Sequence, residues 1–142
     1  MGFRLKVDGD KAIDIKEEQI NSVEFLSVTP ISSNSRATEL GLGVRINGKI
    51  NFALGASSED STVELASWSV LPSDDPKCYR KVDLQVVTAG QVVRNYILPN
   101  AFVMNYTESL DDENGVGMFE ITLRQKRDLN AGVELKGGFE AQ

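Results

Sequence analysis

The segment Tyr79–Leu98, YRKVDLQVVTAGQVVRNYIL, decides the fold. Apolar residues alternate with polar ones on both sides of Ala89-Gly90, which is the pattern of strands that bury one face. Tight hairpin turns favour glycine because their central positions require positive φ angles. The segment therefore predicts a β-hairpin with strands at 79–88 and 91–98.

A second alternating segment runs from residue 40 to residue 52. Its apolar positions are Leu40, Leu42, Val44, Ile46, Ile50 and Phe52, and Gly48 interrupts them. The positions between them include the polar residues Arg45, Asn47, Lys49 and Asn51. We expect a long half-buried strand that bends at Gly48. Its polar face would suit a water-filled lumen and would suit ordinary solvent equally.

Further strands are expected at 3–7, 13–15, 23–28, 117–126 and 133–135. Pro99-Asn100 is expected to interrupt pairing after the hairpin, because proline has no N–H to donate, so that the chain turns a corner there. The acidic stretch 111–115 is expected to be a solvated hairpin loop. These elements predict one mainly β domain over residues 1–142, an antiparallel β-barrel or sandwich.

One segment departs from the β pattern. Ser61-Thr62-Val63-Glu64 fits a capping box, and Pro72 prevents continuation, so we expect a short packed helix from about 61 to 70. Val63 shares one face with Ala66 and Val70, whereas Leu65 and Trp68 point the opposite way. The helix either plugs the open end of its own barrel, or it gives Leu65 or Trp68 to a neighbouring subunit.

The composition excludes several classes of function. The 142 residues include 15 basic and 21 acidic side chains, a net charge of −6, and no histidine. Catalysis and metal binding through histidine are therefore impossible, and a basic surface for nucleic acid is not expected. The single Cys78 cannot form an internal disulfide. The serines lack a nucleophile motif, so we expect no enzyme, no cofactor and no metal.

Targeting signals are also missing from the sequence. No apolar run approaches the roughly 20 residues of a membrane helix, and the first ten residues, MGFRLKVDGD, contain no apolar signal core. We therefore expect neither a signal peptide nor a membrane anchor.

Two motifs resemble a known family. Val82–Gly90 follows the form V-x-L-x-V-x-x-A-G, and Tyr96–Tyr106 follows Y-x-L-x-N-A-x-V-x-x-Y. With the helix before them and the strand after them, they resemble the tube proteins of contractile injection systems. These are the haemolysin co-regulated protein (Hcp) of type VI secretion and the tail-tube proteins of phages and phage-like particles. The resemblance covers about residues 61–126.

The resemblance implies a structural role. Six protomers would form a ring whose strands join into an inner barrel, and the rings would stack into a hollow tube that meets sheath and baseplate proteins. Assembly would occur in the cytoplasm, before release as part of an extracellular or phage-like particle. An extended loop that reaches the next ring corresponds here to residues 29–39, with Thr29, Ile31, Asn34, Arg36 and Glu39 as stacking residues.

One other function remains open from the sequence, a non-catalytic β-sandwich module for binding, adhesion or baseplate assembly. An enzyme is the third hypothesis and is not expected. With 7% aromatic residues and a single tryptophan that is expected on a helix, a platform for stacking sugars is disfavoured.

Overall fold

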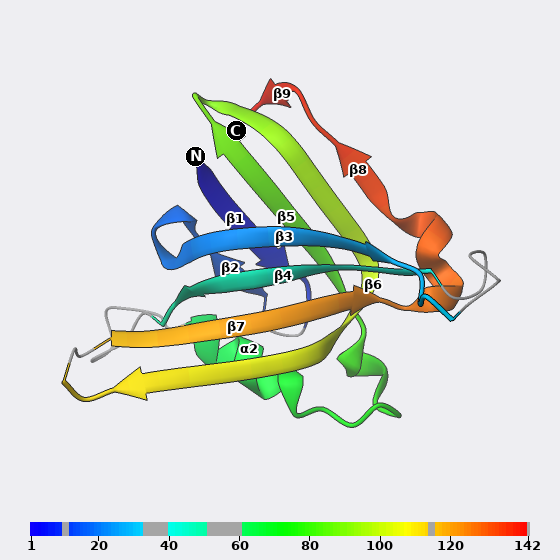
Figure 1. The fold of residues 1–142 in the computed structure, drawn as a ribbon, viewed down its shortest axis with the longest axis horizontal. Helices are drawn as coiled ribbons and strands as arrows, with labels where there is room; N and C mark the ends of the chain where they lie inside the picture. The colour runs from blue at the N-terminus through cyan, green and yellow to red at the C-terminus, as the bar shows by residue number, and fades with distance from the viewer. Residues whose placement is uncertain (10–11, 33–39, 51–60, 114–115, 142) are drawn as a thin grey trace.

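The computed structural model describes residues 1–9, 12–32, 40–50, 61–113 and 116–141. Within these ranges the chain forms one α-helix, α2 (Ser61–Ser69), and nine strands (Figure 1). The strands are β1 (Gly2–Val7), β2 (Ile13–Ile15), β3 (Ile20–Val28), β4 (Gly41–Lys49), β5 (Arg80–Thr88), β6 (Gln91–Asp111), β7 (Val116–Gln125), β8 (Glu134–Lys136) and β9 (Phe139–Glu140). Three short 3-10 helices connect them, η1 (Glu17–Gln19), η2 (Pro76–Cys78) and η3 (Arg127–Gly132).

All nine strands belong to one antiparallel sheet. Its main path is β2-β1-β5-β6-β7-β4-β3, and β8 and β9 pair with β6. The sheet bends over itself, so that β3 crosses above β1 and packs against it without pairing (Figure 1). The expected mainly β fold with one short helix is confirmed, in the form of a bent sheet that stays open in the described residues.

The predicted hairpin is confirmed by β5 and β6. Thr88 pairs with Gln91 across the turn, and both turn residues have positive φ angles, 52° at Ala89 and 76° at Gly90. This is the backbone of a two-residue turn whose twist matches that of the paired strands.

The predicted interruption at Pro99-Asn100 is confirmed, because the register between β5 and β6 passes from Leu98, opposite Val82, to Ala101, opposite Arg80, and skips both residues. The strand itself does not end there, since β6 runs for 21 residues from Gln91 to Asp111. Instead β6 changes partner at Ala101, which pairs with Arg80 of β5 on one side and with Gln125 of β7 on the other. The register shifts between Arg80 and Val82 at this point, and such a bulge bends a strand without ending it.

The bent sheet and α2 enclose one apolar core. It contains, among others, Leu5, Val44, Ile46, Leu65, Trp68, Leu84, Leu98, Ile121 and Leu123. The indole Nε1 of Trp68 donates a hydrogen bond of 2.8 Å to the carbonyl oxygen of Cys78, so this buried side chain also satisfies its polar atom. The helix therefore closes the core on the side that the bend leaves open (Figure 1).

Candidate assembly surfaces

A four-stranded part of the sheet presents a polar outer face. It consists of β3, β4, β7 and the second half of β6, and its polar side chains stand in cross-strand rows. Arg45 of β4 lies 3.1 Å from Glu24 of β3 and 3.6 Å from Glu120 of β7, measured between side-chain nitrogen and oxygen atoms. In the next row Asn47 donates a 3.2 Å hydrogen bond to Ser22. These exposed ion pairs add little stability. They give this face of the sheet a polar surface.

The predicted lumen residues lie on this face. The register places Arg45 beside Glu24 and Thr122, and Asn47 beside Ser22 and Glu120. Lys49 follows at the end of β4 and is exposed, whereas Arg45 and Asn47 are half-buried by their neighbours. Asn51 lies outside the described residues. One face of β4 therefore carries the three described members of the set.

Two strand edges of the polar sheet have no partner in the described part of the chain. There β3 pairs only with β4, and residues 102–111 of β6 pair only with β7. Each edge presents a row of backbone N–H and C=O groups that can pair with another strand. Near the second edge Leu110 is 65% exposed, an apolar side chain on a strand that projects from the core.

The structure places Leu65 and Trp68 in the core of the protomer. Their exposed fractions are 0% and 2%, so they cannot also contact a neighbouring subunit. The first of the two sequence alternatives therefore holds, and the assignment of these residues to a subunit interface is corrected. The side chains that α2 leaves open to a neighbour lie on its other face, where Val63 is 53% exposed.

The expected stacking loop is described only at its base. Thr29 is half-buried and Ile31 is fully exposed, whereas Asn34, Arg36 and Glu39 lie outside the described residues. Val28 pairs with Gly41, which brings the two ends of the segment together. Asn130 of η3 donates a 2.8 Å hydrogen bond from Nδ2 to the carbonyl oxygen of Leu40 and so fixes the second end.

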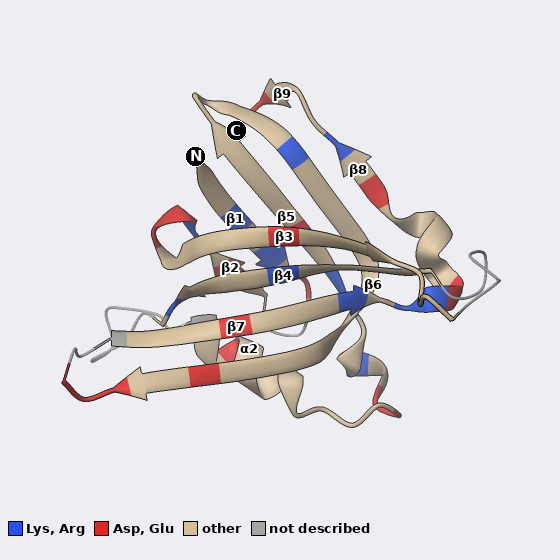
Figure 2. Cartoon of the chain, in the orientation of Figure 1, with Lys and Arg blue, Asp and Glu red and all other residues tan. Residues whose placement is uncertain are grey.

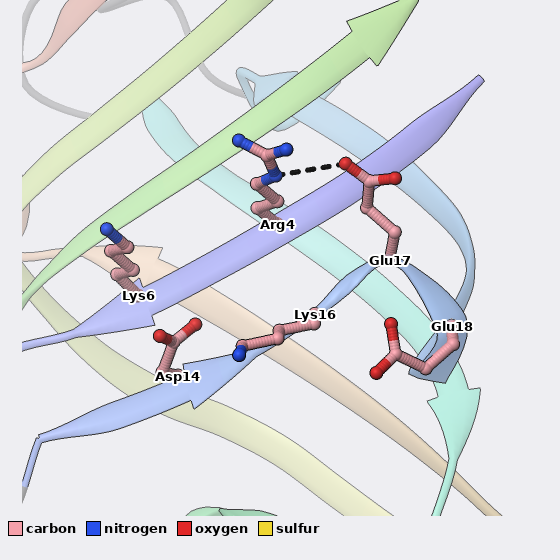
Figure 3. Close-up of a pocket in the computed structure, with 6 residues that line it drawn as sticks. All are labelled: Arg4, Lys6, Asp14, Lys16, Glu17 and Glu18. Carbon is pink, nitrogen blue, oxygen red and sulfur yellow. Dashed lines mark hydrogen bonds and ion pairs between the residues drawn. The ribbon is translucent and has the colours of Figure 1, made fainter. Parts of the chain in front are cut away.

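A hollow of about 410 Å³ is lined by charges of both signs. It lies over β1, β2 and η1, and its residues are Arg4, Lys6, Asp14, Lys16, Glu17 and Glu18 (Figure 3). Arg4 Nε and Glu17 Oε1 form an ion pair of 2.9 Å across it. The lining residues are all charged, so the hollow is a charged surface.

A second, smaller hollow is predominantly basic. Its volume is about 230 Å³, and it is lined by Asp8, Gly9, Lys77, Tyr79, Arg80 and Lys81. It combines the loop after β1 with η2 and the start of β5. Sequence reasoning missed this site, although three cations within five residues, Lys77, Arg80 and Lys81, were a visible signal.

Within the described ranges, two titratable groups have shifted pKa values, Cys78 and Asp83. Burial raises the pKa of the Cys78 thiol, and nearby Asp75 raises it further, so little thiolate exists at neutral pH. Burial also raises the pKa of Asp83, against the opposing charges of Lys81, Lys6 and Lys136. Among the residues that the structure describes, no three acidic or cysteine side chains are placed to hold a metal ion. The same part of the chain contains no helix with the length and hydropathy of a membrane span.

Solved structures with a similar fold include an Hcp protein and chains from contractile assemblies. Hcp1 from Flavobacterium johnsoniae matches 99% of this chain over 100% of its own, with 13% identity and a TM-score of 0.57. A chain in the extended sheath–tube complex of the extracellular contractile injection system PVC matches 96% of this chain over 89% of its own, with 16% identity and a TM-score of 0.53. A chain in the six-fold symmetrised baseplate of the anti-feeding prophage matches 96% over 93%, with 15% identity and a TM-score of 0.53.

The chain has the Hcp-like tube fold. The match extends over almost the whole chain, beyond the segment 61–126 that carries the sequence motifs, and so includes β1 to β4. No family profile matches the sequence, and no curated protein is significantly similar to it. Because the identities are only 13% to 16%, these matches show that the backbones fold alike.

Proposed function

We propose that this protein is the inner-tube subunit of a contractile, phage-tail-like injection apparatus. Residues 1–142 act as one tube domain, six copies form a ring, and rings stack into a hollow tube without catalysis. Sheath and baseplate proteins of the same apparatus are its other partners. The tube assembles in the cytoplasm and leaves the cell as part of the particle.

The open polar sheet is the observation that carries this proposal. The free edge of β3 and the free edge of residues 102–111 of β6 lie on opposite sides of the same four strands. Pairing the first edge of one copy with the second edge of the next extends the sheet and removes both edges. Repetition around an axis closes the ring, with the Arg45 and Asn47 face as a continuous polar wall.

The comparisons support a ring of six copies that associates with sheath and baseplate proteins. One matching chain belongs to a baseplate that is six-fold symmetrised, and another belongs to a complex of sheath and tube. A six-membered ring of this chain would therefore carry the same symmetry as that baseplate. Thr29 and Ile31 remain our candidates for the ring-stacking loop, together with Asn34, Arg36 and Glu39 outside the described residues.

The mass of the purified full chain tests the proposal. Size-exclusion chromatography with light scattering is expected to give a species of about six times the 15.6 kDa protomer, and negative-stain microscopy is expected to show rings with a central hole. A monomer at every concentration would contradict the proposal and favour a binding or baseplate module.

A matched pair of substitutions tests the edge. Leu110→Lys places a charge beside the free edge of β6 and is expected to shift most of the protein from rings to monomers. Leu135→Lys alters an equally exposed leucine of β8, 58% against 65%, and is expected to leave the rings intact. Equal behaviour of the two variants would place the ring contact elsewhere.

A further inference from the structure

The basic hollow contains an arginine whose charge is not matched. Arg80 Nε donates a 3.3 Å hydrogen bond to the carbonyl oxygen of Lys77, and its guanidinium carbon lies 5.4 Å from the centre of the Trp68 ring. Its Nη1 is buried and has no hydrogen-bond partner in the described part of the chain. Asp8 lines the same hollow, yet no ion pair joins it to Arg80 within the described residues.

A buried guanidinium nitrogen without an acceptor is costly. An unsatisfied buried polar group costs about 1–3 kcal/mol, and a charged group costs more. Arginine recovers this loss best from a carboxylate, which can accept two parallel hydrogen bonds from the guanidinium fork. The buried Nη1 is itself closed to a partner from outside the protomer, so an external anion is attracted by the net positive charge of the hollow and meets the lysines that line it, Lys77 and Lys81.

The surroundings of Arg80 favour the same kind of ligand. Lys77 and Lys81 line the hollow, and the Nζ of Lys126 lies 5.5 Å from the centre of the Tyr79 ring on its wall. Gly9 keeps space open, since a Cβ there would come within 3.1 Å of the Arg80 guanidinium. A carboxylate at the hollow thus meets the charges of Lys77 and Lys81, whereas Lys126 already lies 3.5 Å from Asp128.

The chain carries a matching anion at the other end of the same sheet. The turn between β6 and β7 begins with Asp111, Asp112 and Glu113, all exposed (Figure 2). Asp111 Oδ1 accepts a 3.0 Å hydrogen bond from the backbone N–H of Glu113, which shapes the turn. Asp111 lies ten residues along β6 from Ala101, the pairing partner of Arg80, so about 33 Å of strand separates the two sites.

We propose that the acidic turn Asp111–Glu113 of one copy binds the Arg80 hollow of the next copy, in the stacking direction of the tube. The two sites are complementary in charge and too far apart to meet within one protomer. A contact between different surfaces of identical chains that runs along the tube axis does not close on itself, which is how a filament grows. This inference rests on the proposed function and adds a second stacking contact to that of the loop 29–39.

Reversing the charge of one site at a time tests the contact in the full chain. Asp112→Lys with Glu113→Lys reverses the turn and leaves Asp111 to shape it. Lys77→Glu with Lys81→Glu reverses the rim of the hollow. Each double variant is expected to keep the ring mass and to lose the stacks seen by negative-stain microscopy. A chain that carries all four substitutions is expected to stack again, because the complementarity is restored with the signs exchanged.

Matched controls alter the same number of charges on the larger hollow. Lys6→Glu with Lys16→Glu, and Asp14→Lys with Glu18→Lys, are expected to stack like the unmodified protein. Arg80→Gln removes the central charge and is expected to lose the stacks, with a thermal melt to establish that it folds. Rings that never stack, or stacks that survive the reversals, would overturn the inference. Absence of rings in the unmodified protein would instead contradict the proposed function.

Discussion

At the scale of the residue, the helix shows how burial decides between folding and assembly. Leu65 and Trp68 face inward from α2, and a buried leucine contributes about 1.5–3 kcal/mol through the removal of its surface from water. Val63 lies on the same helix with half of its side chain exposed. A substitution at Leu65 therefore acts on the free energy of unfolding, whereas one at Val63 acts on the surface.

The two positions give a matched prediction. Leu65→Asp buries an unpaired carboxylate and is expected to lower the free energy of unfolding by more than about 4 kcal/mol, enough to unfold the protein. Val63→Asp is expected to change it by about 0.5 kcal/mol or less. Thermal unfolding followed by circular dichroism measures both. A Leu65→Asp variant that melts like the unmodified protein would show that the helix does not close the core.

At the scale of the element, the glycines of β4 are needed for close packing. A Cβ added to Gly43 would overlap the carbonyl oxygen of Leu123, and one added to Gly48 would overlap the carbonyl oxygen of Gln19. At Gly41, in the same strand, the nearest atom to an added Cβ is 3.6 Å away, which is an ordinary contact. The strand therefore tolerates a side chain at its start and not at these two positions.

Alanine substitutions along β4 test this difference. Gly43→Ala and Gly48→Ala are each expected to lower the free energy of unfolding by about 1–3 kcal/mol, because neighbouring backbone must move. Gly41→Ala is expected to change it by about 0.5 kcal/mol or less. Chemical denaturation with a common slope distinguishes them. Three equal midpoints would mean that the neighbouring strands yield without cost.

At the scale of the whole molecule, the two proposed contacts differ in their physical origin. Pairing between β3 and the free edge of β6 uses backbone hydrogen bonds and the side chains beside them, which salt screens weakly. Contact between the acidic turn and the Arg80 hollow depends on charges near the surface, for which the screening length falls from about 10 Å at 0.1 M salt to about 3 Å at 1 M.

Added salt should therefore separate stacked rings at a lower concentration than it dissociates a ring into protomers. Between 0.05 M and 1 M sodium chloride, the length of the stacks is expected to fall to single rings while the mass of the ring stays constant. Dynamic light scattering follows the length, and light scattering after chromatography at each salt concentration gives the ring mass. Stacks that lengthen in high salt would indicate an apolar stacking contact instead.

The sequence by itself determined the strands and the hairpin. Alternation such as that of Val82, Leu84 and Val86 assigns residues to faces because the side chains of a strand point to opposite sides at every step. The capping pattern at Ser61 and the limit at Pro72 located the helix for similarly local reasons. The two motifs in 82–106 also pointed to the tube fold, which the structural comparisons support.

Only the tertiary structure decided which strands pair with each other and which face of the helix is buried. The alternation of apolar and polar residues does not show which strand lies beside which. It could therefore not reveal that β6 changes partner at Ala101, or that residues 102–111 pair on one side only in the described part of the chain. Helical spacing grouped Leu65 with Trp68 but could not say what they contact. The basic hollow joins residues 8–9 to residues 77–81, and only the pairing of β1 with β5 brings these distant segments together.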